Sequence, residues 1–459
     1  MNLEPVDVVV IGAGPAGMAG ARTLADLGLS VVLLDEQSAV GGQIYRGIGN
    51  ATPARRELLG EDYAAGARLA DAMKGANVRH ETGASVWQIT RERQVHYLKD
   101  GRVRSFAARA VLLATGAMER PFPIPGWTLP GVMTAGAAQI LLKTAGIGPQ
   151  GPVVLAGCGP LLYLLGWQYL RAGIPIAALV DTSRREDYWN ARRHLLAALR
   201  AWPYLRKGVS LLRALRKGEV PHYTGAEQLQ VEGEGQAQAL SFVVDGKAQR
   251  VLANTVLLHQ GVVPNIQFTQ ALRAQHRWDD AQLCFVPETD GWGALDVPFI
   301  AVAGDGAGIG GAQAAALQGQ LAALGLARNL GQITPAQRDA QAAPLRAELE
   351  RNLRIRPFLD ALYRPREENR IPARDDVTIC RCEEVTAGDV RRFVELGCSG
   401  PNQAKSFGRC GMGPCQGRMC GLTVTEIIAK SRGLTPDEVG YYRIRPPIKP
   451  ITLGELASG

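Results

Sequence analysis

The stretch that decides the fold is Val6-Asp7-Val8-Val9-Val10-Ile11-Gly12-Ala13-Gly14-Pro15-Ala16-Gly17. An apolar run typical of a buried strand leads into a Gly-x-Gly-x-x-Gly turn, and the residues up to about Leu27 are typical of a helix. Gly12 would make the turn, Gly14 would let a phosphate approach the backbone, and Gly17 would let the helix pack closely on the strand. The helix N-terminus would offer free N–H groups and a positive dipole end. The stretch therefore predicts a dinucleotide-binding βαβ unit.

An acid follows at the expected place. The second predicted strand, Ser30 to Leu34, ends at Asp35, and 17 residues separate Gly17 from Asp35. A carboxylate there can accept hydrogen bonds from the ribose hydroxyls of an adenosine, and it would repel a 2′-phosphate. A glycine-rich motif can also be a plain tight turn, and Asp35 could be a solvated strand-end acid. The strand before the turn and the helix after it favour the nucleotide site.

Composition limits the remaining possibilities. The 459 residues allow about three domains, and 46% hydrophobic residues with 20% charged residues are ordinary for a globular protein. The net charge is +8, but no stretch alternates basic and aromatic residues, so nucleic-acid binding is not expected. The excess of positive charge either forms a patch for acidic partners or has no specific role. The N-terminus lacks a basic signal region and no apolar run reaches about 18 residues, so we expect a cytoplasmic chain without a transmembrane segment.

A second βαβ unit starts near residue 151. Its expected parts are a strand at Val153–Ala156, a turn at Gly157–Pro160, a helix at Leu161–Arg171 and a strand at Ile174–Val180 that ends at Asp181. Leu162 stands where the third glycine belongs, and 18 residues separate it from Asp181. An NAD(P)H site is therefore doubtful here. The alternatives are a vestigial unit and a unit that holds another adenine nucleotide.

Taken together, residues 1 to about 330 resemble the two-dinucleotide-domain flavoproteins that include the disulfide reductases. Three further stretches carry the resemblance: Val111-Leu112-Leu113-Ala114-Thr115-Gly116, Val256-Leu257-Leu258 with Gly261, Pro264 and Asn265, and Ala301-Val302-Ala303-Gly304-Asp305. The resemblance implies bound FAD, with Asp305 at the ribityl and pyrophosphate groups and the helix after Gly311 directed at the flavin. The cofactor-binding residues expected on this basis are Gly12, Gly14, Pro15, Ala16, Gly17, Asp35, Glu36, Gly42, Gln43, Ala114, Thr115, Gly116, Gly304 and Asp305.

Disulfide reduction is not expected, because Gln43 and Ile44 follow the Gly41-Gly42 turn where reductases of this group carry paired cysteines, and Cys158 has no partner nearby in the sequence. The six histidines are scattered without a nucleophile pattern. The catalytic residues are therefore left unassigned.

Six of the eight cysteines fall between Cys380 and Cys420. Such clustering in a cytosolic chain favours metal binding over disulfides, and four thiolates hold either zinc or an iron–sulfur cluster. The Cys380-Arg381-Cys382 start is followed by 32 residues before Cys415 and by 27 before Cys410.

This region resembles the [2Fe-2S] domain of bacterioferritin-associated ferredoxin type, and residues 411–420 closely resemble its second half in anaerobic glycerol-3-phosphate dehydrogenase and opine oxidase subunits. The resemblance implies Cys380, Cys382, Cys415 and Cys420 as cluster ligands, with Cys398 and Cys410 left over. Gly411, Gly413 and Gly417 would let backbone N–H groups approach the sulfurs. Zinc or buried free thiols are the alternative.

The expected fold is α/β, with two Rossmann-like dinucleotide-binding domains of disulfide-reductase type and a small helical [2Fe-2S] domain. The expected parts are 1–150 with 261–332 (FAD domain), 151–260 (second nucleotide domain), 333–372 (helical linker), 373–430 ([2Fe-2S] domain) and 431–459 (extended, proline-rich tail). Residues 191–217 are basic and apolar at helical spacing. Pro203 and Gly208 interrupt them, so two short helices against a partner or the second domain are favoured over a membrane-surface helix.

As a whole the chain resembles the alpha (A) subunits of multi-subunit dye-linked amine dehydrogenases, such as opine oxidase, D-hydroxyproline dehydrogenase and hydrogen cyanide synthase. The resemblance implies a catalytic flavoprotein (beta) subunit that oxidises the C–N bond, a small ferredoxin-like subunit that can join, and electron transfer through this chain to a quinone or other acceptor. Partners could hold the chain at the inner membrane surface. The alternatives are a self-contained NAD(P)H-dependent FAD oxidoreductase and a scaffold with structural FAD.

Overall fold

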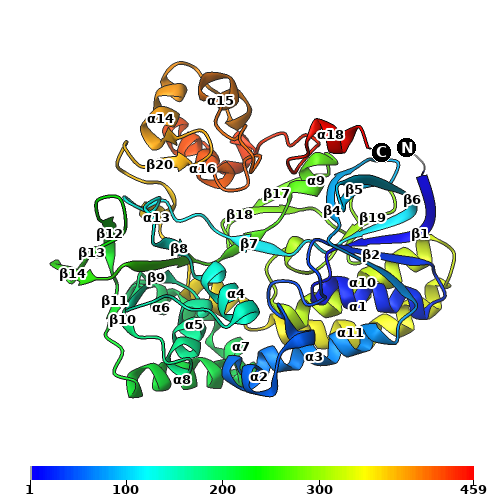
Figure 1. Ribbon diagram of the computed structural model, residues 1–459, viewed down its shortest axis with the longest axis horizontal. Coiled ribbons are helices and arrows are strands. Elements are labelled where there is room, and N and C mark those ends of the chain that lie inside the picture. Colours follow the sequence, from blue (N-terminus) through cyan, green and yellow to red (C-terminus); the bar gives the residue numbers. More distant parts are fainter. Residues whose placement is uncertain (1–2, 459) are drawn as a thin grey trace.

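The computed structural model describes residues 3–458 and contains two parallel-sheet units side by side, with a helical module on top (Figure 1). The first sheet has the order β3-β2-β1-β6-β5-β4, with β19 also paired to β6. Its strands are β1 (Leu3–Ile11), β2 (Val31–Asp35), β3 (Val78–Thr82), β4 (Ser85–Ile89), β5 (Gln94–Lys99), β6 (Arg102–Leu113) and β19 (Ile300–Val302). Strands β1, β2, β3, β6 and β19 are parallel, while β4 and β5 form an antiparallel edge. Val8, Val9 and Val10 are fully buried, as expected for a strand covered on both faces.

Two long helices lie against this sheet and cross each other at close range. They are α1 (Pro15–Asp26) and α10 (Ala312–Asn329), and the shorter α2 (Pro53–Leu59) and α3 (Glu61–Lys74) lie nearby. A side chain at Gly319 of α10 would collide with the backbone carbonyl of Ala16 in α1. Glycine at 319 therefore lets the two helix backbones touch, which brings the start of α10 close to the first glycine turn.

The second sheet has the order β11-β10-β9-β15-β8 and is parallel throughout. Its strands are β8 (Val132–Thr134), β9 (Val153–Cys158), β10 (Ile176–Asp181), β11 (His222–Thr224) and β15 (Thr255–Gln260). Helices α4 (Ala135–Ala145), α5 (Pro160–Arg171), α6 (Arg185–Ala191), α7 (Leu195–Arg200) and α8 (Trp202–Lys217) accompany it, with a small antiparallel sheet of β12 (Glu227–Glu232), β13 (Ala239–Val244) and β14 (Lys247–Leu252).

Two details of the second unit differ from the expectation. Strand β8 pairs with β15, and α4 packs on the same sheet, so residues 132–145 join the second unit although they were expected in the first domain. We therefore propose that the first domain ends near Gly131 and not at residue 150; the other boundaries stay predictions. Helix α8 runs through Gly208 without a break, because Gly208 lies on the exposed side of a long helix whose other face is anchored by Leu211 and Leu215.

The two units are joined by a pair of short crossover strands, β7 (Ala117–Glu119) and β16 (Val262–Pro264). The cysteine module lies above these strands, at the top of the view in Figure 1. The remaining elements are α9 (Gln267–Ala271), β17 (His276–Asp279), β18 (Cys284–Pro287), α11 (Pro335–Leu353), α12 (Arg356–Leu362), α13 (Glu367–Arg370), β20 (Thr378–Cys380), β21 (Val385–Thr386), α14 (Ala387–Glu395), α15 (Pro401–Gly408), α16 (Gly421–Arg432), α17 (Pro436–Val439) and α18 (Leu453–Leu456).

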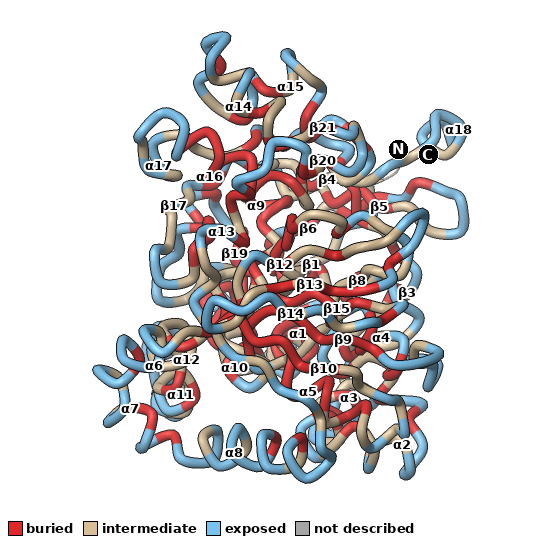
Figure 2. The backbone as a smooth tube through the Cα atoms, turned by 90° about the vertical axis from the view of Figure 1, so that its left-hand side faces the viewer, coloured by how far each residue is buried: buried red, intermediate tan, exposed pale blue. Residues whose placement is uncertain are grey.

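The proline-rich part of the tail is not helical, in agreement with the sequence, and only the short α18 follows it. The tail leaves the cysteine module and returns to the first sheet, where the N–H of Ile448 donates to the carbonyl of Trp87 at 3.0 Å. Buried residues follow the strands of both sheets, while α7 and α8 are exposed over much of their length (Figure 2).

Candidate functional site

The first glycine turn has the geometry that its motif predicts. Gly12 has φ +101°, and a side chain on it would collide with the carbonyl of Ala114 at the end of β6. A side chain on Gly17 would collide with the carbonyl of Gly12. Only glycine fits at these two positions, because the turn and helix α1 lie directly against β6. Gly14 faces more open space, where the nearest atom to an added Cβ is the Cα of Gly42 at 3.8 Å.

The acids at the end of β2 lie beside this turn. A carboxylate oxygen of Asp35 accepts from the N–H of Ala13 at 2.5 Å, and the other accepts from the N–H of Gln37 at 2.7 Å. Glu36 forms an ion pair with Lys449 of the tail, whose pKa is lowered to about 8 by burial. The C-terminal tail therefore reaches the acids that were expected to bind the adenosine ribose.

The other expected cofactor residues gather around the same turn. The carbonyl of Asn265 accepts from the hydroxyl of Thr115 at 3.2 Å, and the N–H of Asn265 donates to the carbonyl of Gly116 at 2.9 Å. Asp305 accepts from the N–H groups of residues 310 and 311 at 2.9 Å each, directly before α10. A Cβ on Gly304 would lie 2.9 Å from that of Ala16. Strands β1, β6 and β19 thus bring together at one edge the residues that the sequence placed far apart.

The buried side-chain oxygen of Asn265 at this edge lacks a hydrogen-bond partner within the described residues, and so does the side-chain oxygen of Gln318 in α10. An orphaned buried acceptor is costly unless something donates to it. Asn265 borders Gly116, and Gln318 lies in the helix whose start Asp305 holds. The residues present therefore fit a cofactor that offers N–H or O–H groups along its length, as FAD does. Asn265 was visible in the sequence pattern, whereas nothing in the sequence singled out Gln318.

A buried lysine next to Gln43 was missed by the sequence reasoning. The ammonium of Lys143 in α4 donates to the carbonyl of Gln43 at 3.2 Å and to the side chain of Gln139 at 2.8 Å. Gln139 donates in turn to Gln168 at 2.9 Å. Burial, with a smaller contribution from the charge of Arg46, lowers the pKa of Lys143 to about 7. A single lysine in an Ala/Leu-rich helix gives no local signal of such burial.

The second nucleotide turn is closed by the protein itself. Asp181, at the end of β10, is fully buried and accepts from the hydroxyl of Tyr163 and from the N–H of Ser183 at 2.8 Å. The thiol of Cys158, in the turn, donates to the carbonyl of Tyr363 at 3.6 Å. Leu162 is fully buried in the core between α5 and the second sheet. The acid and the turn that a dinucleotide would need are therefore already occupied by side chains and by the segment after α12.

Five of the six clustered cysteines meet in the C-terminal module. The sulfurs of Cys380, Cys410 and Cys420 all lie within 4.8 Å of one another and are buried. Cys382 is exposed and hydrogen bonds to Cys415, which is half-buried. Cys398 lies elsewhere and donates to the carbonyl of residue 400 at 3.3 Å. The loop before α16 and the strand β20 supply these sulfurs, and soft sulfur groups at this spacing suit zinc or an iron–sulfur cluster.

Cys410 is therefore closer to the expected ligands than its place in the sequence suggested. The thiols of Cys410 and Cys420 donate to Cys380 and lower the pKa of Cys380 to about 2, and the N–H of Gly411 assists. Gly411 has φ +81°, and a side chain there would lie about where the ring of Tyr442 packs. Loop closure before α16 thus places a fifth sulfur beside the expected four, which spacing alone could not reveal.

The cysteine module packs directly on the crossover strands. Leu422 of α16 and Tyr441 join Val263 and Phe285 in one apolar cluster, and the rings of Phe285 and Tyr441 lie 5.5 Å apart. Tyr442 is close to the sulfur of Cys420, at 3.8 Å. The sulfur site and the crossover strands that lead to Gly116 and Asn265 are therefore parts of one packed structure.

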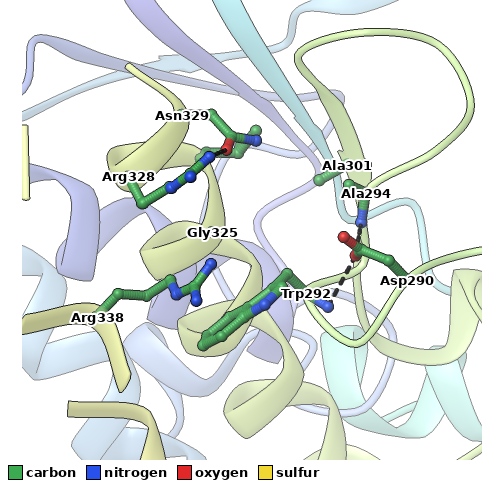
Figure 3. A pocket seen from close by; sticks show the side chains of 9 residues that line it. Asp290, Trp292, Ala294, Ala301, Gly325, Arg328, Asn329 and Arg338 are labelled. Carbon is green, nitrogen blue, oxygen red and sulfur yellow. Dashed lines mark hydrogen bonds between the residues drawn. The ribbon is translucent and has the colours of Figure 1, made fainter. Parts of the chain in front are cut away.

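A cavity of about 250 Å³ lies away from both sites (Figure 3). Its wall includes Trp292, with the guanidinium groups of Arg338 and Arg346 at 4.0 and 4.3 Å from the ring centroid. Arg338 pairs with Asp339 at 2.8 Å, and Arg346 donates to the carbonyl of residue 291. These contacts hold α11 against the loop before β19.

The fold and the two sites define a class: an oxidoreductase with the pyridine nucleotide-disulphide oxidoreductase fold and an added cysteine-rich module. Residues 6–159 match the family model of the pyridine nucleotide-disulphide oxidoreductases, and residues 377–459 match the sarcosine oxidase A3 domain. L-proline dehydrogenase from P. horikoshii has the same fold, with a TM-score of 0.71 at 19% identity over 99% of this chain and 80% of that chain.

The chain belongs to the family formed by the A subunit of opine oxidase and the HcnB subunit of hydrogen cyanide synthase. It is 45% identical to the opine oxidase A subunit of Agrobacterium tumefaciens, over 98% of this chain and 91% of the relative. It is 33% identical to the HcnB subunit of Pseudomonas aeruginosa, over 98% and 97%. The resemblance found in the sequence is confirmed, and so is the expected α/β fold of disulfide-reductase type with a cysteine-rich module near the C-terminus. No helix within residues 3–458 is long and apolar enough to cross a membrane.

Proposed function

We propose that this chain is the FAD- and [2Fe-2S]-containing subunit of a multi-subunit dye-linked dehydrogenase that oxidises the C–N bond of an amino acid or opine. A catalytic flavoprotein (beta) subunit removes the electrons from the amine, and this chain relays them to an acceptor such as a quinone. A small ferredoxin-like [2Fe-2S] subunit can join the complex. The assembly is cytoplasmic, with partners able to hold it at the inner membrane surface.

The observation that carries this proposal is the packing of the five-sulfur site against the crossover strands beside the expected FAD site. Tyr442 contacts Cys420, and Tyr441 contacts Phe285 in the cluster with Val263. FAD accepts an electron pair and a [2Fe-2S] centre passes single electrons, so neighbouring sites for both suit a relay. The residues that would hold FAD are those around Gly12, Asp35, Thr115 and Asp305.

The ligand set that we propose takes Cys420 rather than Cys410 as the neighbour of Cys380, as the resemblance to the [2Fe-2S] domain implies. Cys380 with Cys420 and Cys382 with Cys415 are two neighbouring pairs, each with one sulfur from β20 or the turn after it and one from the loop before α16. Two irons, each held by two thiolates, would use both pairs. We propose these four as ligands, with Cys410 as an additional buried thiol beside Cys380 and Cys420.

The self-contained NAD(P)H oxidoreductase is the weaker alternative. Its nicotinamide nucleotide would need Asp181 and the turn at Cys158, and both are engaged with Tyr163 and Tyr363. The closed second site therefore favours a chain that receives electrons from a partner protein.

The proposal is tested on the complex that co-purifies with this chain from its native cells. We expect one FAD, two irons and two acid-labile sulfides in this chain, and flavin bleaching with a member of a panel of opines, proline derivatives and amino acids. The paramagnetic signal of a reduced [2Fe-2S] centre should appear during turnover. Iron-free complex with full dye-linked activity would contradict the relay.

A further inference from the structure

One end of the molecule, opposite the cysteine module, is formed by α6, α7 and α8, and we call residues 185–217 the helical end surface (Figures 1 and 2). Nine of the 19 exposed large apolar side chains in residues 3–458 lie in it. They are Tyr188, Trp189, Leu195, Leu196, Leu199, Trp202, Tyr204, Val209 and Leu212. Leu196 is 78% exposed, Trp189 63% and Trp202 57%. Such a concentration marks an interaction site, because scattered apolar residues are normal on a surface but grouped ones are not.

The same surface is strongly basic. Its exposed charged side chains are Arg185, Glu186, Arg192, Arg193, Arg200, Arg206, Arg213, Arg216 and Lys217. Arginine outnumbers lysine among them, and the guanidinium of Arg192 lies over the ring of Trp189. Tryptophan, tyrosine and arginine are the residues that dominate the energy of protein–protein contacts, whereas lysine is depleted there. The charge requires an acidic partner surface.

The inner side of the helical end surface is firmly anchored. Ala198 and Ala201 pack with Ile355 in one buried cluster, and the hydroxyl of Tyr204 hydrogen bonds to Asn352 at 3.0 Å. Lys207 forms an ion pair with Asp62 of α3. A surface held in this way is preorganised, so a partner meets little conformational entropy cost in binding it.

Two other occupants fit less well. In α8, Trp202, Arg206, Val209 and Arg213 share one outward face, since at 3.6 residues per turn their directions around the helix axis lie within about 60° of one another. A helix that lies in a membrane surface carries its apolar and its charged residues on separate faces. The outward face of α8 mixes the two kinds of residue. A second copy of the chain is disfavoured by like charge, because the chain carries a net charge of +8.

We propose that the helical end surface binds a partner subunit of the complex through an acidic surface with apolar pockets for Trp189, Leu196 and Trp202. The inference rests on the proposed function, because it takes the partner from the multi-subunit assembly. It adds where on this chain that partner docks, and by which chemistry.

The test measures, by interferometry, the affinity of this chain for the partner subunits that co-purify with it. Trp202→Ala and Leu196→Asp should each weaken binding at least about tenfold. Arg213→Glu should weaken it and reduce its dependence on salt concentration. Leu252→Asp is the matched control, because Leu252 is 65% exposed on β14 outside this surface, and its affinity should stay at the wild-type value. Circular dichroism and thermal melting check that each variant is folded.

Wild-type affinity in folded Trp202→Ala and Leu196→Asp would overturn the docking surface while leaving the proposed function intact. A wild-type chain with which no partner subunit co-purifies would instead contradict the proposed function. Flotation with phosphatidylglycerol-containing vesicles that Leu196→Asp abolishes would overturn the proposal in favour of a membrane contact. A dimer of the isolated chain in sedimentation velocity that Leu196→Asp dissociates would overturn it in favour of self-association.

Discussion

The carboxylate of Asp181 and the hydroxyl of Tyr163 are hydrogen bonded to each other inside the second parallel-sheet unit. Asp181 ends β10, at the position where a dinucleotide fold presents an acid to the ribose. Burial raises the pKa of Asp181, and Tyr163 shields it from solvent. The second unit thus has the βαβ architecture, while its acid forms a hydrogen bond that holds α5 against the sheet.

The closed second site predicts that pyridine nucleotides are poor reductants of this protein. Stopped-flow mixing of the isolated chain with NADH or NADPH should show no fast, saturable bleaching of the flavin. The same preparation should be reduced by the partner subunits with their amine substrate. Rapid saturable reduction by NADH would show that the site around Asp181 opens, and it would restore the self-contained reductase.

Gly14→Val should abolish retention of the FAD while the chain still folds. Gly14 has φ −75°, so valine meets no backbone strain, and its side chain would project toward Gly42 where the pyrophosphate approaches. The visible absorbance of the flavin per chain after gel filtration measures the bound cofactor. Gly49→Val is the control, because a Cβ at Gly49 has no atom within 4 Å, and it should purify yellow. A yellow Gly14→Val protein would place the cofactor elsewhere.

The cysteine variants separate ligands from the additional thiol. Cys420→Ser should lose the cluster or make it labile, because a hydroxyl is a hard, poor ligand for iron among thiolates. Cys410→Ser and the distant Cys398→Ser should keep two irons and two sulfides per chain, and all three should keep FAD. Iron and sulfide analysis of each variant, together with the paramagnetic signal of the reduced centre, measures whether the cluster is present. A normal cluster in Cys420→Ser, with loss in Cys410→Ser, would redraw the ligand set around Cys410.

Lys143 predicts a pH dependence of stability. Its pKa is lowered from 10.5 to about 7 by burial, so between pH 7 and 10.5 the unfolded chain binds a proton that the folded chain does not. The free energy of unfolding should therefore rise with pH in this window by up to about 1.4 kcal/mol per pH unit relative to Lys143→Met. Urea unfolding of both proteins at pH 7 and pH 9 measures the difference, which we expect to be about 2 kcal/mol. Parallel stabilities at the two pH values would show that Lys143 keeps an ordinary pKa.

Much of the first site could be predicted from the sequence because its determinants are local. The turn at Gly12 and Gly17 needs glycine for contacts with residues a few positions away or on the next strand, and β1 and α1 are set by periodicity and by Pro15 at the helix start. The family pattern around Thr115 and Asp305 added the strands that complete the edge. Their ordering in a parallel sheet brings these segments together whatever loops lie between them.

What only the tertiary structure decided depends on contacts between distant segments. The sequence alone determined that the chain has two βαβ units and a cysteine-rich end, because motif spacing and strand or helix period are properties of short stretches. It could not show that Tyr363 covers the turn of Cys158, that Lys143 lies buried beside Gln43, or that Cys410 reaches Cys380. Each of these depends on how loops between elements close in space, and loop closure is set by the packing of the whole core rather than by the residues that it brings together.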